Sequence, residues 1–497
     1  MLTYTGHPLL DVGAATITVF SGKDRPEELT DADLEAAADY MAANYPRPPL
    51  RGYLTTVFPN ADGFTQPAYF NDPAKQARYA DLVLRAFRDA VPTLDERDPF
   101  LDRPVPNVSY NVKDELPAGR AYRQHIPMQM GVGVINFYAE GDAGLPVSGA
   151  ALLAFQALPL GCAKCGGRPL AVHSDNPAIL RHFAGRFLED NRRAIALQQA
   201  ADGDKMPEAD RSFRTLLIET LLAAREMQAR SAARETPFSV TAYHFSNSGQ
   251  GASLDLYHLP GQVILYLREM LAADYAQTWG RLVGAAWERP KLKRGQPPTD
   301  FRPRRNWLYE DLFQVANDPQ RYAPRFIRTY FLRRAYRYAR QDETDPRGGY
   351  STRDEAALVS WRLLEPFLKR ILAMQQARIN HIRALGDALA AYVREENDRR
   401  FFREFYVLGR YDQLRVALLK ANNRHVARGR KPLLTLDGYL SVFEEGEELA
   451  RADWRLARDL VLIRMIEQLY ESGWLGRNED VIAEADTEAN NDSDDTH

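Results

Sequence analysis

A change in residue pattern near residue 260 constrains this fold more than any other feature of the sequence. Before it, short β-branched and aromatic runs alternate with helical stretches, whereas after Gln262 the strand-like runs nearly vanish. Apolar residues then recur at helical spacing, as in Leu364, Phe367, Leu368 and Ile371. The sequence therefore predicts an α+β protein, in which a mixed α/β N-terminal part precedes a basic helical region and a C-terminal helical bundle.

The chain length of 497 residues exceeds what one hydrophobic core usually organises. Residues 288–306 and 341–355 are polar, contain Pro and Gly, and mark candidate boundaries. We expect a mixed α/β domain (1–260), a basic helical segment with a linker (261–350), a helical bundle (351–477) and a tail (478–497). The tail is predicted to be disordered because it holds eight acidic residues and no Lys, Arg or aromatic residue.

Local signals predict several elements of the N-terminal part. Thr30 is a candidate N-cap for a helix that continues to about Tyr45, and Asn176-Pro177 opens a helix that continues to about Ala200. Strands are predicted where β-branched and aromatic residues gather between turn residues, at Gly52–Phe58, Gly133–Tyr138, Arg168–His173, Phe238–Phe245 and Ser253–Leu259.

The composition is ordinary for a folded protein, with 45% hydrophobic and 26% charged residues. Two cysteines cannot build a disulfide framework, and the N-terminus lacks a basic region and carries Asp11, unlike a signal peptide. The longest apolar stretch, residues 149–160, is too short to cross a bilayer. The sequence therefore predicts a cytoplasmic protein with no membrane partner.

Two segments carry dense positive charge. The first contains Asp300 as its only acid and the basic residues Arg289, Lys291, Lys293, Arg294, Arg302, Arg304 and Arg305. The second, residues 321–340, contains seven arginines and no acid. Helical spacing places Arg321, Arg325 and Arg328 on one face, beside the aromatic residues Tyr322, Phe326 and Tyr330.

Cations next to aromatic side chains suit a nucleic-acid backbone, because guanidinium groups match phosphate oxygens and their binding releases counterions. The same pattern is also typical of a solvated helix face above a core stripe of aromatics, and the sequence leaves both interpretations open. A third basic cluster is expected on a turn between bundle helices and comprises Arg424, His425, Arg428, Arg430 and Lys431.

The loop that joins the last two predicted strands differs in chemistry. It reads Phe245-Ser246-Asn247-Ser248-Gly249-Gln250-Gly251, with amide and hydroxyl side chains on a glycine-rich backbone. Asn and Gln amides pair with adenine edges, so Asn247, Ser248 and Gln250 are candidates for reading DNA bases. Turn conformation alone also accounts for such a composition.

Cys162 and Cys165 form a CxxC turn, which supplies two of the four ligands of a tetrahedral zinc ion. No second CxxC exists, so no cofactor is predicted, and zinc at Cys162 and Cys165 stays an alternative. No P-loop, HExxH, GxSxG or kinase motif is present either. The sequence predicts a protein that is not an enzyme, with a metal-dependent nuclease built from dispersed acids as the alternative.

Several segments together resemble the large subunit of subtype I-B CRISPR interference (Cascade) complexes. From residue 4 to about residue 260 they read, in order, YTGHPLLDVG, ATITVFSGK, PPLRGYLTTVFPNADGFTQP, RQHIPMQMGVGVINFYAEGDAGLPVSG, ALPLGCAKCGGRPLAVHSDNP and YHFSNSGQGASLDLYHLP. Members of that family carry two CxxC pairs. This chain keeps only Cys162 and Cys165, which puts the family's zinc site in doubt.

The resemblance implies a non-catalytic subunit of an RNA-guided antiviral complex. Such a subunit recognises the protospacer-adjacent motif in target double-stranded DNA, helps to hold the CRISPR guide RNA and the R-loop, and recruits a separate helicase-nuclease. Its other partners are the backbone and small subunits. On this sequence we expect motif reading at Asn247, Ser248 and Gln250, and backbone contacts at the three basic clusters.

The resemblance also extends to the C-terminal helices, which are similar to the separate small subunit of these complexes. Met374 is a candidate internal start for such a fragment. The basic turn at Arg424, Arg428, Arg430 and Lys431 is then expected to contact a displaced single strand through its phosphates.

Overall fold

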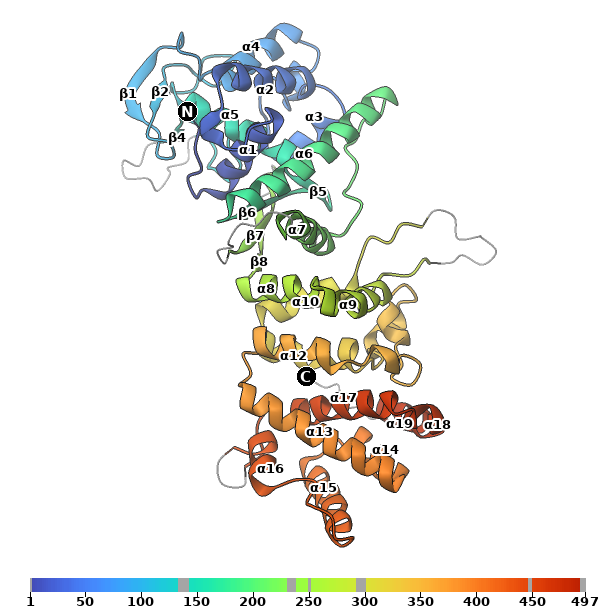
Figure 1. Cartoon of the computed structure of the whole chain (residues 1–497). Coiled ribbons are helices and arrows are strands. Elements are labelled where there is room, and N and C mark those ends of the chain that lie inside the picture. The colour runs from blue at the N-terminus through green and yellow to red at the C-terminus, as the bar shows by residue number, and fades with distance from the viewer. Residues whose placement is uncertain are drawn as a thin grey trace. The chain divides into compact units, whose positions relative to one another are not determined.

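The computed structural model describes residues 2–132, 143–229, 238–248, 252–291, 301–445 and 449–491. The chain divides into two units, Met1–Gly261 and Gln262–His497. Unit 1 combines helices with small antiparallel sheets and unit 2 is helical, so the predicted α+β class is confirmed (Figure 1). The division lies next to the expected boundary at residue 260, and the expected segments 261–350 and 351–477 belong to the same unit.

The core of unit 1 is built around α1 (Pro8–Phe20). This helix is apolar on all sides, and it packs against α2 (Asp31–Asn44), α5 (Gly149–Ala157) and α6 (Pro177–Ala200), as Figure 1 shows. Gly13 allows the crossing with α5, since a Cβ atom there would lie 1.8 Å from the Ala154 carbonyl oxygen. The buried Asp11 carboxylate anchors the chain before α1 by accepting hydrogen bonds from Thr5 and Gly6 amides.

One antiparallel sheet of four strands covers α1. Its order is β5 (Ala163–Cys165), β6 (Arg168–Ser174), β7 (Val240–Ser246) and β8 (Ser253–Leu259). The His173 ring on β6 reaches the Asp11 carboxylate at 3.2 Å and so links the sheet to α1. Two small strand pairs join β1 (Thr93–Arg97) to β2 (Pro104–Pro106) and β3 (Arg120–Ala121) to β4 (Leu145–Pro146).

The remaining helical segments of unit 1 are short apart from α7. They are η1 (Pro26–Glu28), α3 (Leu50–Leu54), η2 (Pro67–Tyr69), α4 (Pro73–Leu84), η3 (Leu158–Gly161) and α7 (Phe213–Ala229).

Three predicted strands and two predicted helices are confirmed. The strands are β6, β7 and β8, and the helices are α2, capped by Thr30, and α6, capped by Asn176. The expected strand Gly133–Tyr138 lies outside the described residues.

The strand predicted at Gly52–Phe58 is wrong, because α3 and the turns that follow it occupy this segment. Its side chains Tyr53, Leu54, Val57 and Phe58 are all buried, and their spacing places them on one side of a helical coil. Burial at helical spacing outweighs the β-propensity of the individual residues.

The described part of unit 2 consists of helices with turns and longer links between them. In its described residues, extended pairing is limited to the isolated bridges Trp287–Asn306 and Glu444–Ala450. Its first half contains α8 (Gly261–Met270), α9 (Ala273–Ala285), α10 (Trp307–Asn317), α11 (Pro319–Phe326), the π-helical turn η4 (Ile327–Phe331), η5 (Arg337–Gln341), η6 (Pro346–Gly349), η7 (Ala356–Leu358) and α12 (Trp361–Arg370). Its second half contains α13 (Gln376–Glu396), α14 (Arg399–Val407), α15 (Tyr411–Val426), α16 (Leu436–Phe443), α17 (Trp454–Glu471), α18 (Trp474–Arg477) and α19 (Glu479–Asn491).

The central pair of unit 2 is α13 and α17, which lie side by side in Figure 1. Gly386 on α13 permits their close approach, because a Cβ atom there would lie 2.7 Å from the Arg464 Cβ atom on α17. Most of α17 is buried on every side, as expected of a core helix.

The structure differs from the expected disordered tail, because residues 479–491 form α19. This helix packs against α14, where Arg403 lies 2.9 Å from Glu484 and Arg399 pairs with Asp480. Val481, Ile482 and Ala485 are buried beneath these pairs. The acidic residues therefore serve as partners for α14, which composition alone does not reveal.

Candidate nucleic-acid interface

Asn247, the first residue expected to read DNA bases, is fully buried in unit 1. Its side-chain amide donates to the Val57 carbonyl oxygen at 2.9 Å and to the Arg123 carbonyl oxygen at 3.0 Å. Its backbone amide donates to the Thr56 carbonyl oxygen at 2.8 Å. The structure thus corrects the expectation for Asn247, whose amide is committed to the backbone of neighbouring segments.

Arg123 clamps the same loop from the other side, and sequence reasoning missed it. Its guanidinium donates to the carbonyl oxygens of Asn247, at 2.8 Å, and of Ser248. Ser248 keeps a partly exposed side chain, whereas Gln250 lies outside the described residues. Of the two motif-reading candidates that the structure describes, Ser248 has a solvent-accessible side chain and Asn247 does not.

The structure brings the two ends of the first basic segment together. The Glu288 amide donates to the Arg305 carbonyl oxygen at 2.9 Å, beside the bridge between Trp287 and Asn306. Five cations of this segment are exposed, and they are Arg289, Lys291, Arg302, Arg304 and Arg305. Lys293 and Arg294 lie outside the described residues. The exposed cations thus gather where the two described ends of this segment meet, and we call residues 289–305 the basic link.

The third basic cluster pairs with two acids at the end of α13 and with the N-cap aspartate of α14. Arg424 lies 3.2 Å from Asp398, and Arg430 lies 2.7 Å from Glu395. Arg428 pairs with Glu396. Lys431 is exposed. Because three of its four formal cations have carboxylate partners, this turn offers little net charge to a phosphate backbone.

The second basic segment lines a groove inside unit 2, with a volume of about 1390 Å³. We call it the arginine groove. From α11, η4, η5 and the turn between them it receives Arg321, Arg325, Arg328, Arg334, Arg337 and Arg340. From α13, α17 and the chain before α17 it receives Arg378, Arg451, Arg455 and Arg458. Two carboxylates, Glu445 and Asp453, lie among these ten arginines.

The floor of the arginine groove is organised by Asp459 on α17. This buried carboxylate lies 2.5 Å from the Arg328 Nε atom and 2.8 Å from the Arg458 Nη2 atom. Burial raises the pKa of such a carboxyl, but Arg328, Arg458 and Arg334 outweigh burial and lower the pKa of Asp459 to about 2. One carboxylate therefore holds two guanidiniums, and the floor keeps net positive charge.

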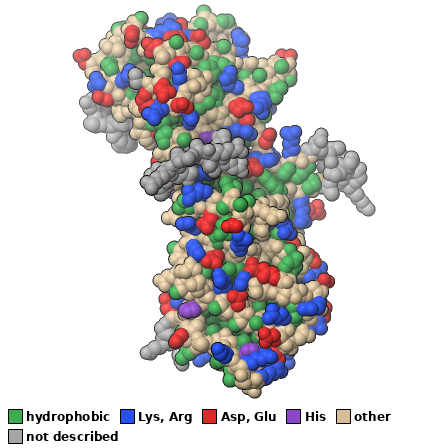
Figure 2. All heavy atoms as spheres, in the orientation of Figure 1, with side chains coloured by type: hydrophobic (Ala, Val, Ile, Leu, Met, Phe, Trp, Pro, Cys, Tyr) green, Lys and Arg blue, Asp and Glu red, His purple; other side chains and the backbone are tan. Residues whose placement is uncertain are grey.

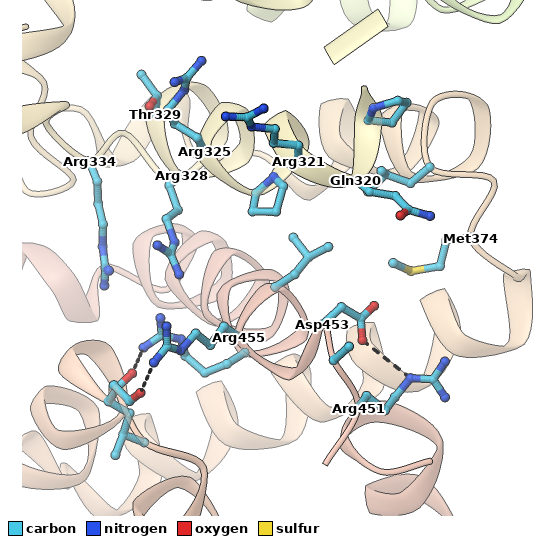
Figure 3. Close-up of a pocket in the computed structure, with 18 of the residues that line it drawn as sticks. Gln320, Arg321, Arg325, Arg328, Thr329, Arg334, Met374, Arg451, Asp453 and Arg455 are labelled. Atoms are coloured by element: carbon cyan, nitrogen blue, oxygen red, sulfur yellow. Dashed lines mark hydrogen bonds and ion pairs between the residues drawn. The ribbon is translucent and has the colours of Figure 1, made fainter. Parts of the chain in front are cut away.

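The guanidinium groups at the floor of the groove repel one another. Burial is the main cause that lowers the pKa of Arg458, Asp459 opposes it, and the neighbouring Arg334 and Arg328 lower it further. Arg334 donates to the Tyr406 carbonyl oxygen at 2.6 Å, and Arg458 donates to that of Leu408. Figure 3 shows Arg328 and Arg334 extending across the groove toward Arg455.

The opposite wall carries the acids of the groove. Arg378 binds the Asp453 carboxylate through two nitrogens, at 2.7 and 2.8 Å, and Arg451 lies 3.6 Å from the same carboxylate (Figure 3). On the molecular face drawn in Figure 2, by contrast, basic and acidic side chains are interspersed over unit 2. The groove is thus far more one-sided in charge than that face.

The aromatic residues of the second segment divide between core and groove. Phe326 is buried and stacks on Phe367, and the buried Tyr330 hydroxyl donates to Asp311 at 2.8 Å. Tyr336 and Tyr338 instead line the groove, and 58% of Tyr338 is exposed. The core-stripe interpretation is therefore confirmed for Phe326 and Tyr330, whereas Tyr336 and Tyr338 place aromatic rings at the groove.

Sequence reasoning missed the four arginines that come from residues 378–458. Arg451, Arg455 and Arg458 do follow one another at helical spacing, which is the signal that could have identified them. Asp453 and Asp459 interrupt them, so the local net charge is small. Only the folded structure, in which Arg328 of η4 pairs with Asp459 of α17, reveals that they share a groove with Arg321, Arg325 and Arg328.

Cys162 and Cys165 are buried at the start of the sheet. The described residues contain no group of three or more His, Cys, Asp or Glu side chains arranged to hold a metal. Burial raises the pKa of the Cys162 thiol, and the neighbouring His244 ring engages the Cys165 carbonyl oxygen at 2.8 Å. Among the described residues, Cys162 and Cys165 therefore lack the further ligands that a tetrahedral zinc site requires.

Within the described ranges, no helix has the combination of length and apolar character that a membrane span requires. Comparisons of the chain with protein-family models, with curated proteins and with solved structures find no match.

Proposed function

We propose that this chain is the non-catalytic large subunit of a CRISPR RNA-guided surveillance complex of subtype I-B. In this role it recognises the protospacer-adjacent motif in target double-stranded DNA, stabilises the guide RNA and the R-loop, and recruits a separate helicase-nuclease. Its other partners are the backbone and small subunits. The proposal combines the resemblance of residues 4–260 with the chemistry of unit 2.

The arginine groove is the observation that carries the proposal. Ten arginines and two carboxylates line it, and the buried Asp459 beneath it offsets only part of the excess. A protein bears the cost of gathering like charges when a polyanion neutralises them, and guanidinium groups match phosphate oxygens in geometry. A nucleic-acid backbone meets both requirements.

The basic link supports the same function. Arg302, Arg304 and Arg305 are exposed in it, and the Arg305 guanidinium lies 4.7 Å from the centre of the Trp307 ring. Exposed cations that lie close together suit contacts to duplex phosphates, which position a protein without reading sequence.

The proposal is tested by target-DNA binding of the guide-loaded complex, assembled with and without this chain. The duplexes differ only in the bases that flank the target. We expect flank-dependent binding only when the chain is present, and cleavage only after a helicase-nuclease is added. Flank-independent binding, or cleavage by the purified chain with a divalent metal ion, would contradict the proposal and favour a nuclease.

Charge reversal of the basic link provides a second test. Arg302, Arg304 and Arg305 are replaced by Glu in the same complex. Because phosphate contacts are independent of sequence, we expect weaker binding to every duplex and a flatter dependence on salt. The control is Arg186→Gln with Arg193→Gln on α6, where both arginines pair with acids one turn away. An effect confined to one flanking sequence would exclude a phosphate role.

A further inference from the structure

We infer that the arginine groove binds a single strand of nucleic acid, with phosphates on its guanidiniums and a base on the Tyr338 ring. This inference rests on the proposed function and specifies the ligand of the groove. It is distinct from the contacts expected of the basic turn at residues 424–431, whose arginines are paired with acids.

The charge of the groove requires a ligand with several anionic groups. Arg321, Arg337 and Arg340 are exposed along its first wall, and the carboxylates of the groove are engaged by Arg378 and Arg451 on the other. A ligand with a single anionic group could neutralise only one of the three exposed arginines Arg321, Arg337 and Arg340. Successive phosphates of a strand supply one charge for each nucleotide.

The size of the groove also favours an extended ligand. Its volume of about 1390 Å³ is above the range of roughly 300–1,000 Å³ that is usual for small-molecule pockets. Two helices, α13 and α17, begin at this groove, and Gln375 and Asp453 at their N-caps make no side-chain capping bond in the described structure. The positive ends of both helix dipoles therefore add to the attraction for phosphate.

The aromatic residues at the start of η5 favour a single strand over a duplex as the ligand. The rings of Tyr336 and Tyr338 lie 5.7 Å apart, and Arg325 and Arg347 hold the Tyr336 ring with guanidiniums 5.3 and 5.1 Å from its centre. Tyr338 is left 58% exposed at the groove. Single strands offer unstacked bases to such rings, whereas a duplex keeps its base faces covered.

An acidic protein segment is the competing ligand. It would match the arginines in charge, but it would bring no planar base to stack on Tyr338. The aromatic contact therefore favours nucleic acid, and the acidic segment becomes one outcome of the test.

The test uses the full-length protein and labelled single strands of about ten nucleotides, a length within the usual site range. DNA and RNA of one sequence are compared with a DNA duplex of equal length and with a polyglutamate peptide as competitor. We expect both single strands, or one of them, to bind more tightly than the duplex. Preference for DNA would indicate a displaced strand, and preference for RNA would indicate the guide.

Two variants with equal loss of charge separate the groove from general electrostatics. The groove variant replaces Arg321, Arg337 and Arg340 with Gln. The control replaces Arg394, Arg400 and Arg410, which are exposed on other helical ends of unit 2, with Gln. We expect the groove variant to bind single strands at least about tenfold more weakly and to lower the salt slope by about 2, and the control to change little.

Tyr338 tests the contact with a base. Tyr338→Ala is expected to weaken single-strand binding by about tenfold without changing the salt slope, and Tyr338→Phe is expected to retain it. Equal binding of duplex and single strand with no effect of Tyr338→Ala would overturn the inference. So would a groove that binds polyglutamate and no oligonucleotide. If only these results fail while flank-dependent binding of the complex still needs the chain, the proposed function stands without this ligand.

Discussion

Asn247 illustrates how a side chain can be placed correctly in a loop and still have a different role. Its amide joins β7 to two segments far away in sequence, at Val57 and Arg123. The residue that the loop composition marks as a base reader is thus a structural bridge. Asn247 fixes the position of the loop and therefore the position of the Ser248 side chain.

We predict that Asn247→Ala lowers the free energy of unfolding of unit 1 by about 1–3 kcal/mol, because the Val57 and Arg123 carbonyl oxygens lose their donor. Urea unfolding of the full-length protein, followed by hydrogen exchange of β7, measures the loss. The matched control, Ser248→Ala, is expected to remain within about 0.5 kcal/mol of the wild type. Unchanged stability together with altered reading of flanking bases would restore Asn247 as a base reader.

His125 makes the stability of unit 1 depend on pH. It is fully buried, its Nδ1 atom accepts from the Tyr122 amide, and its Nε2 atom donates to the Tyr110 carbonyl oxygen. Burial lowers the pKa of His125 to about 4, against the opposing effect of the Tyr110 carbonyl. Between about pH 6.5 and pH 4 the unfolded chain therefore binds a proton that the folded chain does not.

We predict that this group removes roughly 3 kcal/mol of stability as the pH falls from about 6.5 to 4, because the unfolded state gains the proton. Urea unfolding of unit 1 at several pH values measures the loss. His125→Gln is expected to flatten the profile in this window, whereas His258→Gln on the exposed face of β8 keeps it. Identical profiles for the wild type and His125→Gln would show that another group is responsible.

At the scale of elements, capping residues and alternating patterns in the sequence predicted helices and strands correctly. Elements whose conformation depends on burial against distant segments were not predicted. The residues that cap α2 and α6 act through neighbours within four positions, so the sequence contains the whole signal. The segment at residues 52–58 and the helix α19 depend on partners that lie far away in sequence. Their conformations therefore could not be predicted from local propensity.

An ion pair at the buried Asp459 links helix α17 to η4. Asp459 binds Arg328 from η4 and Arg458 from its own helix, and it has no exposed surface. Its depressed pKa means that this stabilisation is complete above about pH 4 and is lost as the pH falls toward 2. The residues at the floor of the groove therefore also hold η4 and α17 together.

We predict that Asp459→Asn lowers the free energy of unfolding of unit 2 by about 3–5 kcal/mol, because the buried Arg458 and the half-buried Arg328 both lose the carboxylate between them. Thermal and urea unfolding at pH 7 measure the change. Asp437→Asn, at an exposed position on α16, is the control with the same loss of charge. A phosphate-containing ligand should restore part of the lost stability, and a loss below about 1 kcal/mol would mean that the pair contributes little.

At the scale of the whole molecule, the arginines of the groove are visible in the sequence, but the sequence does not show that they lie together. Residues 321–340 were identified by their charge, whereas Arg378 and the α17 arginines are diluted by neighbouring acids. The division near residue 260 was visible because composition itself changes there. A groove whose lining residues come from several segments between residues 319 and 458 leaves no comparable mark.

The groove also bears on Met374, the candidate internal start. Met374 lies in the link before α13, half-buried, and lines the groove. A fragment that begins there keeps α13–α19 but lacks Arg328, the ion-pair partner of Asp459, and Thr352, which accepts from the Tyr406 hydroxyl. It also lacks the backbone amide of Trp361 that Glu467 binds.

We predict that the fragment 374–497 remains helical through the packing of α13 on α17 but unfolds at lower urea concentration than the fragment 262–497. The reason is that the fragment exposes the apolar surface under α12 and leaves Arg458 as the only close partner of Asp459 in the described structure. The shorter fragment is also expected to lose single-strand binding, since it lacks Arg321, Arg337, Tyr338 and Arg340. Circular dichroism in urea and oligonucleotide titration of both fragments test this. Equal affinity in the two fragments would place the nucleic-acid site on α13–α19, and the basic turn at residues 424–431 would then be the surface to mutate next.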